Sequence, residues 1–223
     1  FFAARAGGPA PVLLTGFNRR FSPHTRKVAA ALRGRSNPVI IDYFMNAGYI
    51  PADHWVHGPE GGGRNRGEAC HIYDLFTYLV GAQARGVTVG TIRPATGHYF
   101  ASDNFVAPIV FEDGSMATLT YTALGSAAFP KERMIVACDG KVLELTDYRE
   151  LSTFGARART RSALAPDKGL VAELEAFAEC IANGGEWPIP LWQQLQATRI
   201  ANEVESRIRA ASPGAGRRGP AGA

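Results

Sequence analysis

The stretch Gly61–Gly81, GGGRNRGEACHIYDLFTYLVG, decides how this chain is interpreted. Apolar side chains recur in it at helical spacing, which predicts an amphipathic helix over Glu68–Val80 with one buried face. Each residue advances about 100° around a helix, so Glu68, His71 and Asp74 point together, away from that face. Imidazole and carboxylate groups move protons near neutral pH, which makes these three side chains candidate catalytic residues. The buried face would consist of Ala69, Ile72, Tyr73, Phe76, Leu79 and Val80.

The alternative is a plain solvated face, because charged residues opposite an apolar stripe usually face water. Two neighbouring features favour a functional site. The run Gly61–Gly63 is conformationally costly unless something must approach the backbone closely. The preceding loop is rich in aromatic and imidazole rings that could form a pocket wall. Such rings can stack on a substrate or bind its hydroxyl groups. The alternative for each ring is packing without a contact to any ligand. These rings are Tyr49, His54, Trp55 and His57.

Three segments, in this order and spacing, resemble the Gfo/Idh/MocA family of NAD(P)-dependent oxidoreductases. They are GFNRRFSPH (16–24), NAGYIPADHWVH (46–57) and GGGRNRGEACHIYDL (61–75). The resemblance covers about residues 12–208 and is nearest to members linked to sugar and polysaccharide metabolism. It implies an α+β fold, in which helices pack on one face of an open, mostly antiparallel β-sheet, as in the C-terminal domain of that family.

The resemblance also implies a division of the chain. Residues 1–20 resemble the end of a Rossmann domain, with its last strand at about 11–17. Residues 21–211 would form the α+β substrate and oligomerisation domain, and the Gly/Pro/Ala-rich residues 212–223 a disordered tail. The nucleotide-binding half, with the family's catalytic lysine, is expected to be missing. NAD or NADP would serve the intact protein, whereas we expect this fragment to bind no cofactor and to be inactive.

The implied reaction interconverts an alcohol and a ketone on a sugar, nucleotide sugar or cyclitol. His71 matches the family's catalytic histidine, and Asp74 is the acid three residues beyond it. Many members carry an aspartate four residues before the histidine, where this chain has Gly67. Either Glu68 takes over that role or the role is lost.

Asn18, Arg19 and Arg20 follow the Rossmann-like strand, and strand ends of this kind line the ligand crevice in such sheets. We expect Asn18 and Arg19 to contact the cofactor. Arg20 is expected to bind substrate together with the loop residues Tyr49, His54 and Trp55. A solvated turn or an ion pair is the alternative for the two arginines.

Composition argues against several other classes of protein. The net charge of +4 over 223 residues is small and no basic helix carries interleaved aromatic residues, so nucleic acid is not an expected partner. No apolar run approaches the ~20 residues of a membrane helix, and the first residues lack a signal-peptide pattern. Three scattered cysteines predict no disulfide framework and favour a cytoplasmic location.

A metal site is also not expected. His54 and His57, with His71 and Glu68, could in principle supply three or four ligands to zinc. A His-x-x-His pair in a loop, however, lacks the helical context and supporting shell of known zinc patterns.

Turn signals place the strands. EDGS at 112–115 and Asp139-Gly140 each separate two strand-like segments, which predicts two hairpins and a largely antiparallel sheet. Further strands are expected at 38–46 and 87–93, and an edge strand at 151–154. The loop after it, 156–166, is expected to be mobile.

Helices are predicted over 22–32, with Ser22 as N-cap, and over 168–183 and 191–209. The helix over 168–183 is expected to be amphipathic, with four apolar residues on one stripe. This stripe comprises Leu170, Leu174, Phe177 and Ile181.

Alternation along 116–123 predicts a sheet with one buried face and one half-polar, threonine-bearing face. Members of the resembled family commonly associate through that sheet, so a homo-oligomer with a wet interface is expected. The alternative function is therefore a non-catalytic sheet domain that mediates oligomerisation.

Overall fold

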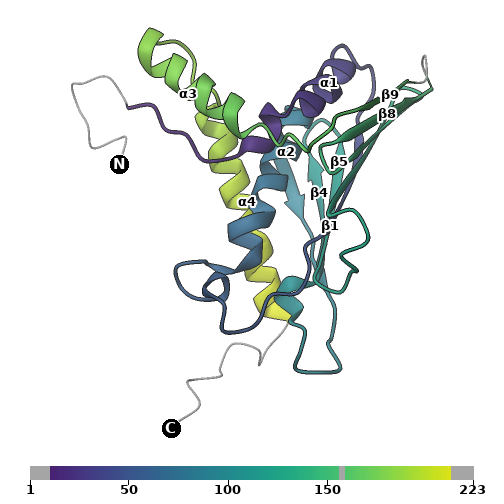
Figure 1. The fold of residues 1–223 in the computed structure, drawn as a ribbon, viewed down its shortest axis with the longest axis vertical. Helices are drawn as coiled ribbons and strands as arrows, with labels where there is room; N and C mark the ends of the chain where they lie inside the picture. Colours follow the sequence, from purple (N-terminus) through teal and green to yellow (C-terminus); the bar gives the residue numbers. More distant parts are fainter. Residues whose placement is uncertain (1–10, 156–158, 212–223) are drawn as a thin grey trace.

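Helices cover one face of an open β-sheet in the computed structural model, which describes residues 11–155 and 159–211 (Figure 1). The expected α+β fold class is confirmed. The helices are α1 (Pro23–Leu32), α2 (Cys70–Val80), α3 (Leu170–Asn183) and α4 (Leu191–Ala211), with a 3-10 turn η1 (Asn18–Phe21) before α1 and shorter 3-10 turns at Trp55–His57 and Ala101–Asp103. The strands are β1 (Ile40–Asn46), β2 (Ala84–Val87), β3 (Gly90–Thr91), β4 (Phe105–Phe111), β5 (Met116–Thr122), β6 (Glu132–Cys138), β7 (Lys141–Thr146), β8 (Glu150–Phe154) and β9 (Arg159–Ser162).

The strands are ordered β2-β4-β5-β1-β6-β7-β8-β9, and β3 pairs with β4. Within this described sheet, β1 and β5 form the one parallel pair. Both predicted hairpins are present, as β4–β5 and β6–β7. Their turns need positive φ, which Gly114 (84°) and Gly140 (71°) supply without steric cost.

Strict alternation sorts the strand residues to two faces. Ile41, Tyr43 and Met45 of β1 are buried on the helix-covered face, which holds the core. The opposite face carries one continuous cross-strand row of apolar side chains, each in register with the next from β4 to β8. We call it the outer row; it consists of Val110, Met116, Ile40, Ala137, Val142 and Phe154, and all but the half-buried Ala137 are exposed. The predicted half-polar face is therefore confirmed, with an apolar line across it.

Three details of the strand prediction were wrong. Residues 11–17 are not a strand of the described sheet, and the Leu13 and Thr15 backbones bond the Gln194 side chain. The division of the chain into domains stays a prediction. The stretch 151–154 is not an edge strand, because β9 pairs with β8 on its outer side. β9 lies within the loop predicted at 156–166, whose residues 156–158 fall outside the described part, as does the tail 212–223.

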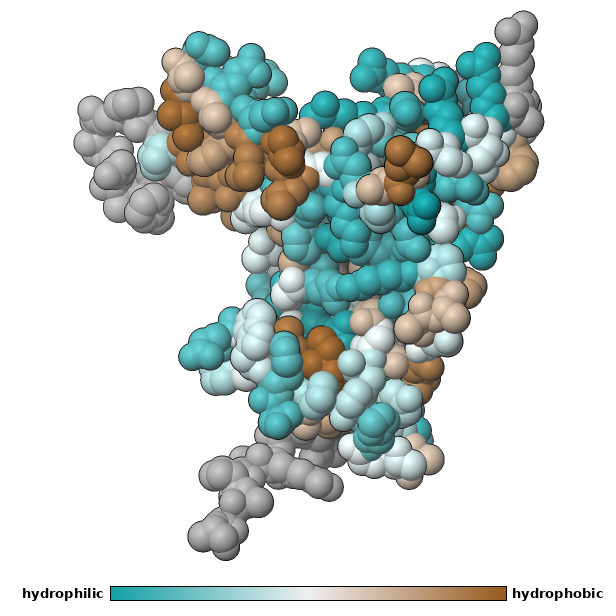
Figure 2. Space-filling view, viewed as in Figure 1, coloured by the Kyte–Doolittle hydropathy of each residue, from teal (hydrophilic) through white to brown (hydrophobic). Residues whose placement is uncertain are grey.

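Helix α3 leaves its predicted apolar stripe largely exposed. Leu170, Leu174 and Ile181 are 58%, 56% and 60% exposed, while Glu173 of the same helix is buried. The apolar surface over α3 is visible in Figure 2. The helix contacts η1, and its N-cap Gly169 lies against the Phe21–Ser22 backbone, while its apolar stripe stays exposed. We call the outward residues Leu170, Val171, Leu174, Phe177 and Ile181 the α3 stripe.

Candidate functional site

The helix that carries the candidate acids begins with a π-helical turn, Asn65–Ala69, before α2 proper. Two glycines permit its close packing against the preceding loop. A Cβ on Gly61 would lie 2.4 Å from Cα of Val56, so the expected close approach to the glycine run is confirmed, and the approaching backbone is the chain's own. A Cβ on Gly67 would lie 3.1 Å from the Gly61 carbonyl oxygen, which leaves little room for an aspartate there.

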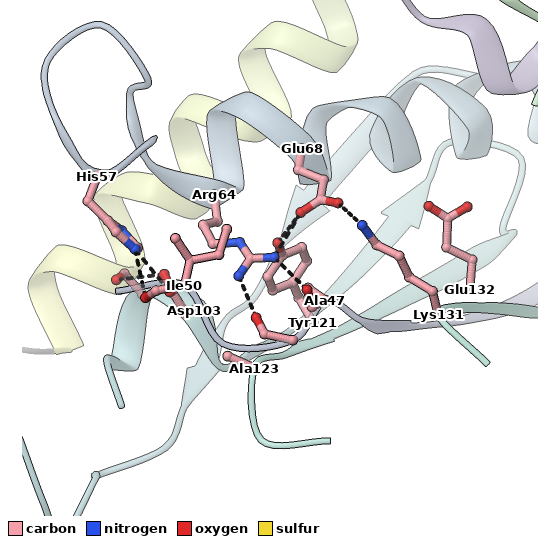
Figure 3. A network of polar contacts seen from close by, with 12 residues as sticks. Ala47, Ile50, His57, Arg64, Glu68, Asp103, Tyr121, Ala123, Lys131 and Glu132 are labelled. Carbon is pink, nitrogen blue, oxygen red and sulfur yellow. Dashed lines mark hydrogen bonds and ion pairs between the residues drawn. The ribbon is translucent and has the colours of Figure 1, made fainter. Parts of the chain in front are cut away.

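Glu68 projects from the π-turn toward the sheet and is held by three donors (Figure 3). It accepts hydrogen bonds from the Tyr121 hydroxyl at 2.5 Å and the Arg64 guanidinium at 3.1 Å, and pairs with the Lys131 ammonium at 2.9 Å. Burial alone would raise the pKa of Glu68. The bonds from Tyr121 and Lys131 outweigh burial and lower this pKa to about 2, so the carboxylate is ionised at neutral pH.

His71 is half-buried at the start of α2, with its ring edge-on to Phe17 at 5.7 Å between centroids. Its Nδ1 has no hydrogen-bond partner among the described residues. Burial, reinforced by the charge of Arg19, lowers the pKa of His71 to about 4, so the ring is neutral at pH 7. The residue borders an open hollow of about 390 Å³ between residues 15–17, α2 and α4.

Asp74 lies one turn further along α2 and forms a closed ion pair. Its two oxygens accept from Nε and Nη2 of Arg20 at 2.9 and 2.5 Å, and both side chains are almost fully buried. Arg20 also donates to Gln193 of α4 at 2.6 Å. Burial raises the pKa of Asp74 to about 6, against the opposing effect of Arg20. The ion-pair alternative for Arg20 is therefore what the structure contains.

A second buried charge cluster lies near His71 and was not identified from the sequence. Glu132 of β6 accepts from Arg19 at 2.6 Å and from Lys168 at 3.2 Å. The Arg19 and Lys168 charges lower the pKa of Glu132 despite its burial, and all three charges act on the pKa of His71. A signal was available, because the β6 alternation that buries Met134 and Val136 also places Glu132 on the inner face.

The loop aromatics lie apart from the hollow beside His71, whose lining does not include them. The Tyr49 ring stacks on His98 at 4.0 Å. His54 accepts from the backbone N–H of Val56, and Trp55 is 63% exposed. The half-buried Asn18 sits at the start of η1.

The predicted residues are thus distributed over several places rather than one pocket. No hydrogen bond or ion pair joins Glu68, His71 and Asp74 to one another in the described ranges, since each acid is bound to its own cations. Within those ranges, no group of three or more His, Cys, Asp or Glu side chains could hold a metal ion. Of the helices that the structure describes, none is long and apolar enough to cross a membrane.

Comparisons with known proteins agree with this fold. No family model matches the chain. The curated "Uncharacterized oxidoreductase YrbE" of Bacillus subtilis is 22% identical, with 90% of this chain and 62% of YrbE covered. UDP-N-acetylglucosamine 3-dehydrogenase GnnA from Acidithiobacillus ferrooxidans matches with a TM-score of 0.71 and 20% identity, over 90% of this chain and 62% of GnnA.

A levoglucosan dehydrogenase solved with NADH and levoglucosan matches with a TM-score of 0.72 and 18% identity, over 90% of this chain and 65% of the enzyme. The chain thus spans slightly under two thirds of the length of each of these proteins. Over that part, the chain shares the fold of these two dehydrogenases.

Proposed function

We propose that this chain is the substrate-binding part of an NAD(P)-dependent dehydrogenase that oxidises a hydroxyl group of a sugar, nucleotide sugar or cyclitol, or reduces the matching ketone. The observation that carries the proposal is the half-buried, neutral His71 beside an open hollow, in a fold shared with sugar dehydrogenases. A nucleotide-binding part would complete the enzyme, and this chain alone would be inactive.

In this proposal His71 accepts the hydroxyl proton, because a neutral imidazole has a free lone pair to receive it. NAD or NADP, when bound, takes the hydride. The ion pair of Arg20 with Asp74 fixes the helix that carries His71. Arg19 donates to Glu132, so we assign it an electrostatic effect on His71 instead of a cofactor contact. Asn18 remains the proposed cofactor contact.

The loop side is assigned to substrate. We assign Tyr49, His54 and Trp55 to a part of the substrate remote from His71, because they do not line the hollow beside that residue. Trp55 offers an exposed ring for stacking, with His54 beside it, and Tyr49 offers the ring face that His98 leaves open. Glu68, ionised and held by Lys131 and Arg64, is the acid proposed in place of the family's aspartate, at whose position this chain has Gly67.

A fusion protein tests this function. In it, the part of levoglucosan dehydrogenase that lies outside the match precedes residue 11 of this chain. We expect the 223-residue chain to bind no NADH in calorimetry. We expect the fusion to bind NADH and to oxidise at least one of levoglucosan, UDP-N-acetylglucosamine and myo-inositol with NAD⁺. NADH binding without oxidation of any of them would contradict the proposal, and micromolar NADH binding by the chain alone would place the cofactor site elsewhere.

The outer row favours a second candidate function, assembly through the sheet. Its apolar side chains line up across β4 to β8 on a face that the described helices leave open. Contiguous apolar surface of this kind marks interaction sites. We expect a dimer or larger assembly in sedimentation velocity, and Ile40→Asp, at the centre of the row, should shift it to monomer. A chain that is monomeric at 100 µM would rule the assembly out.

A further inference from the structure

The α3 stripe is an apolar surface whose exposure contradicts the usual orientation of an amphipathic helix. Leu170, Leu174, Phe177 and Ile181 follow a spacing of three and four residues, as in a helix that packs along its length, and Val171 lies beside Leu170. Yet Leu170, Val171, Leu174 and Ile181 are each more than half exposed. Glu173 is turned inward instead, and burial raises its pKa to about 7. A helix that buries an acid and exposes aliphatic side chains is oriented as if another folded unit packed on its exposed face.

The exposed apolar surface extends beyond α3. Leu13 of the first described segment and Trp192 and Leu195 at the start of α4 are also exposed. Leu13 and α4 are directly connected, because the Leu13 carbonyl accepts from Gln194 at 2.9 Å. α3 itself packs on η1, which follows that segment. The apolar surface therefore lies next to residues 11–17, where an attached unit would join (Figures 1 and 2).

Charge argues against a second copy as the cover. α3 carries two exposed acids, Glu175 and Glu179, and no basic residue, while Glu173 faces inward. In a pair of α3 helices, the exposed acids of one copy would find no basic partner on α3 of the other copy. The stripe instead fits an apolar surface with a basic rim on a different folded unit.

We propose that the α3 stripe is the docking face for the nucleotide-binding part of the same enzyme. The proposal rests on the proposed function for the identity of that part. The relatives leave room for such a part. The match covers 62% of YrbE and 65% of levoglucosan dehydrogenase, so 38% and 35% of these proteins lie outside it. Docking there would place the unit against η1, whose arginines bond Asp74 and Glu132 beside His71.

Hydrogen–deuterium exchange of the peptide spanning α3 tests the docking. We expect its amides to exchange at least about tenfold more slowly in the fusion protein than in the 223-residue chain, because packing suppresses local opening. Leu174→Glu, in the middle of the stripe, should remove that protection. The matched control is Leu164→Glu, the same change at a 99% exposed residue outside the stripe, which should leave protection intact.

The outcomes separate docking from catalysis. Protection of α3 in a fusion that oxidises none of the three substrates would keep the docking face and overturn the function. An active fusion with unprotected α3 would overturn the docking face alone. A third outcome is that the 223-residue chain associates with itself in a concentration-dependent way. If Leu174→Glu abolishes that association and Leu164→Glu does not, a second copy is the occupant of the α3 stripe, and the docking proposal is overturned.

Discussion

Replacing Asp74 with alanine should lower the free energy of unfolding of the 223-residue chain by about 3–5 kcal/mol, the usual cost of breaking a buried ion pair. The Asp74 side chain is fully buried, and Arg20 is 4% exposed. Removing the carboxylate leaves a buried guanidinium whose main counter-charge is gone, with Gln193 as a neutral partner. Urea denaturation followed by circular dichroism measures the change, read as a lower midpoint at an unchanged slope.

Two variants control this result. Glu203→Ala removes an acid from an exposed pair with Arg207 on α4 and should change stability by less than about 0.5 kcal/mol. The double variant Arg20→Met/Asp74→Leu should recover much of the loss, since an apolar replacement of a whole buried pair is often neutral. A loss below about 1 kcal/mol in Asp74→Ala would mean that the pair does not form in solution.

Replacing His71 with glutamine should lower kcat/KM of the fusion protein by roughly 10²–10⁴, the usual contribution of a general acid or base. Glutamine keeps the polar character and approximate size of the side chain but cannot take up a proton. The 223-residue chain carrying the same change should unfold at nearly the wild-type urea concentration, because the Nδ1 of His71 makes no bond with the described residues. Glu203→Ala, which changes an exposed pair on α4, is the control for activity and should leave kcat/KM unchanged.

The pH profile gives an independent reading of the same residue. Because burial and Arg19 hold the pKa of His71 at about 4, its protonation should limit kcat/KM only below about pH 5. The sign follows from the requirement for a neutral ring: activity falls as pH drops through the folded-state pKa. A fall in kcat/KM centred near pH 6.5 that is absent in His71→Gln would show that His71 is solvated. An unchanged kcat/KM in His71→Gln would make His71 a structural residue.

Local features of the fold could be predicted from the sequence. The turns at Gly114 and Gly140 need positive φ, and the Asp-Gly pairs in the sequence predict such turns. The alternation of apolar and polar residues predicts the strands on either side. α2 was predictable from its apolar stripe. The π-turn before it was not, because a change from i+4 to i+5 hydrogen bonding leaves no mark on the apolar spacing.

The candidate site was predictable only in part. Glu68, His71 and Asp74 share one short segment, but the groups that set their charge come from distant ones. Arg20 is 54 residues from Asp74, and Arg19 is 113 residues from Glu132. Periodicity likewise reveals that α3 has an apolar stripe, but not whether a cover for that stripe is part of the same chain.

The neighbouring arginines Arg19 and Arg20 bind different layers, one the sheet through Glu132 and the other α2 through Asp74. The turn η1, which carries both arginines, is therefore held on two sides, by the sheet and by α2. The chain ahead of this turn is also held, because Leu13 and Thr15 bond Gln194 of α4. A polypeptide joined ahead of Leu13 is therefore expected to bend relative to this part of the chain before that residue. In the dehydrogenase proposed above, a movement of that kind would leave the contacts of Arg19 and Arg20 beside His71 in place.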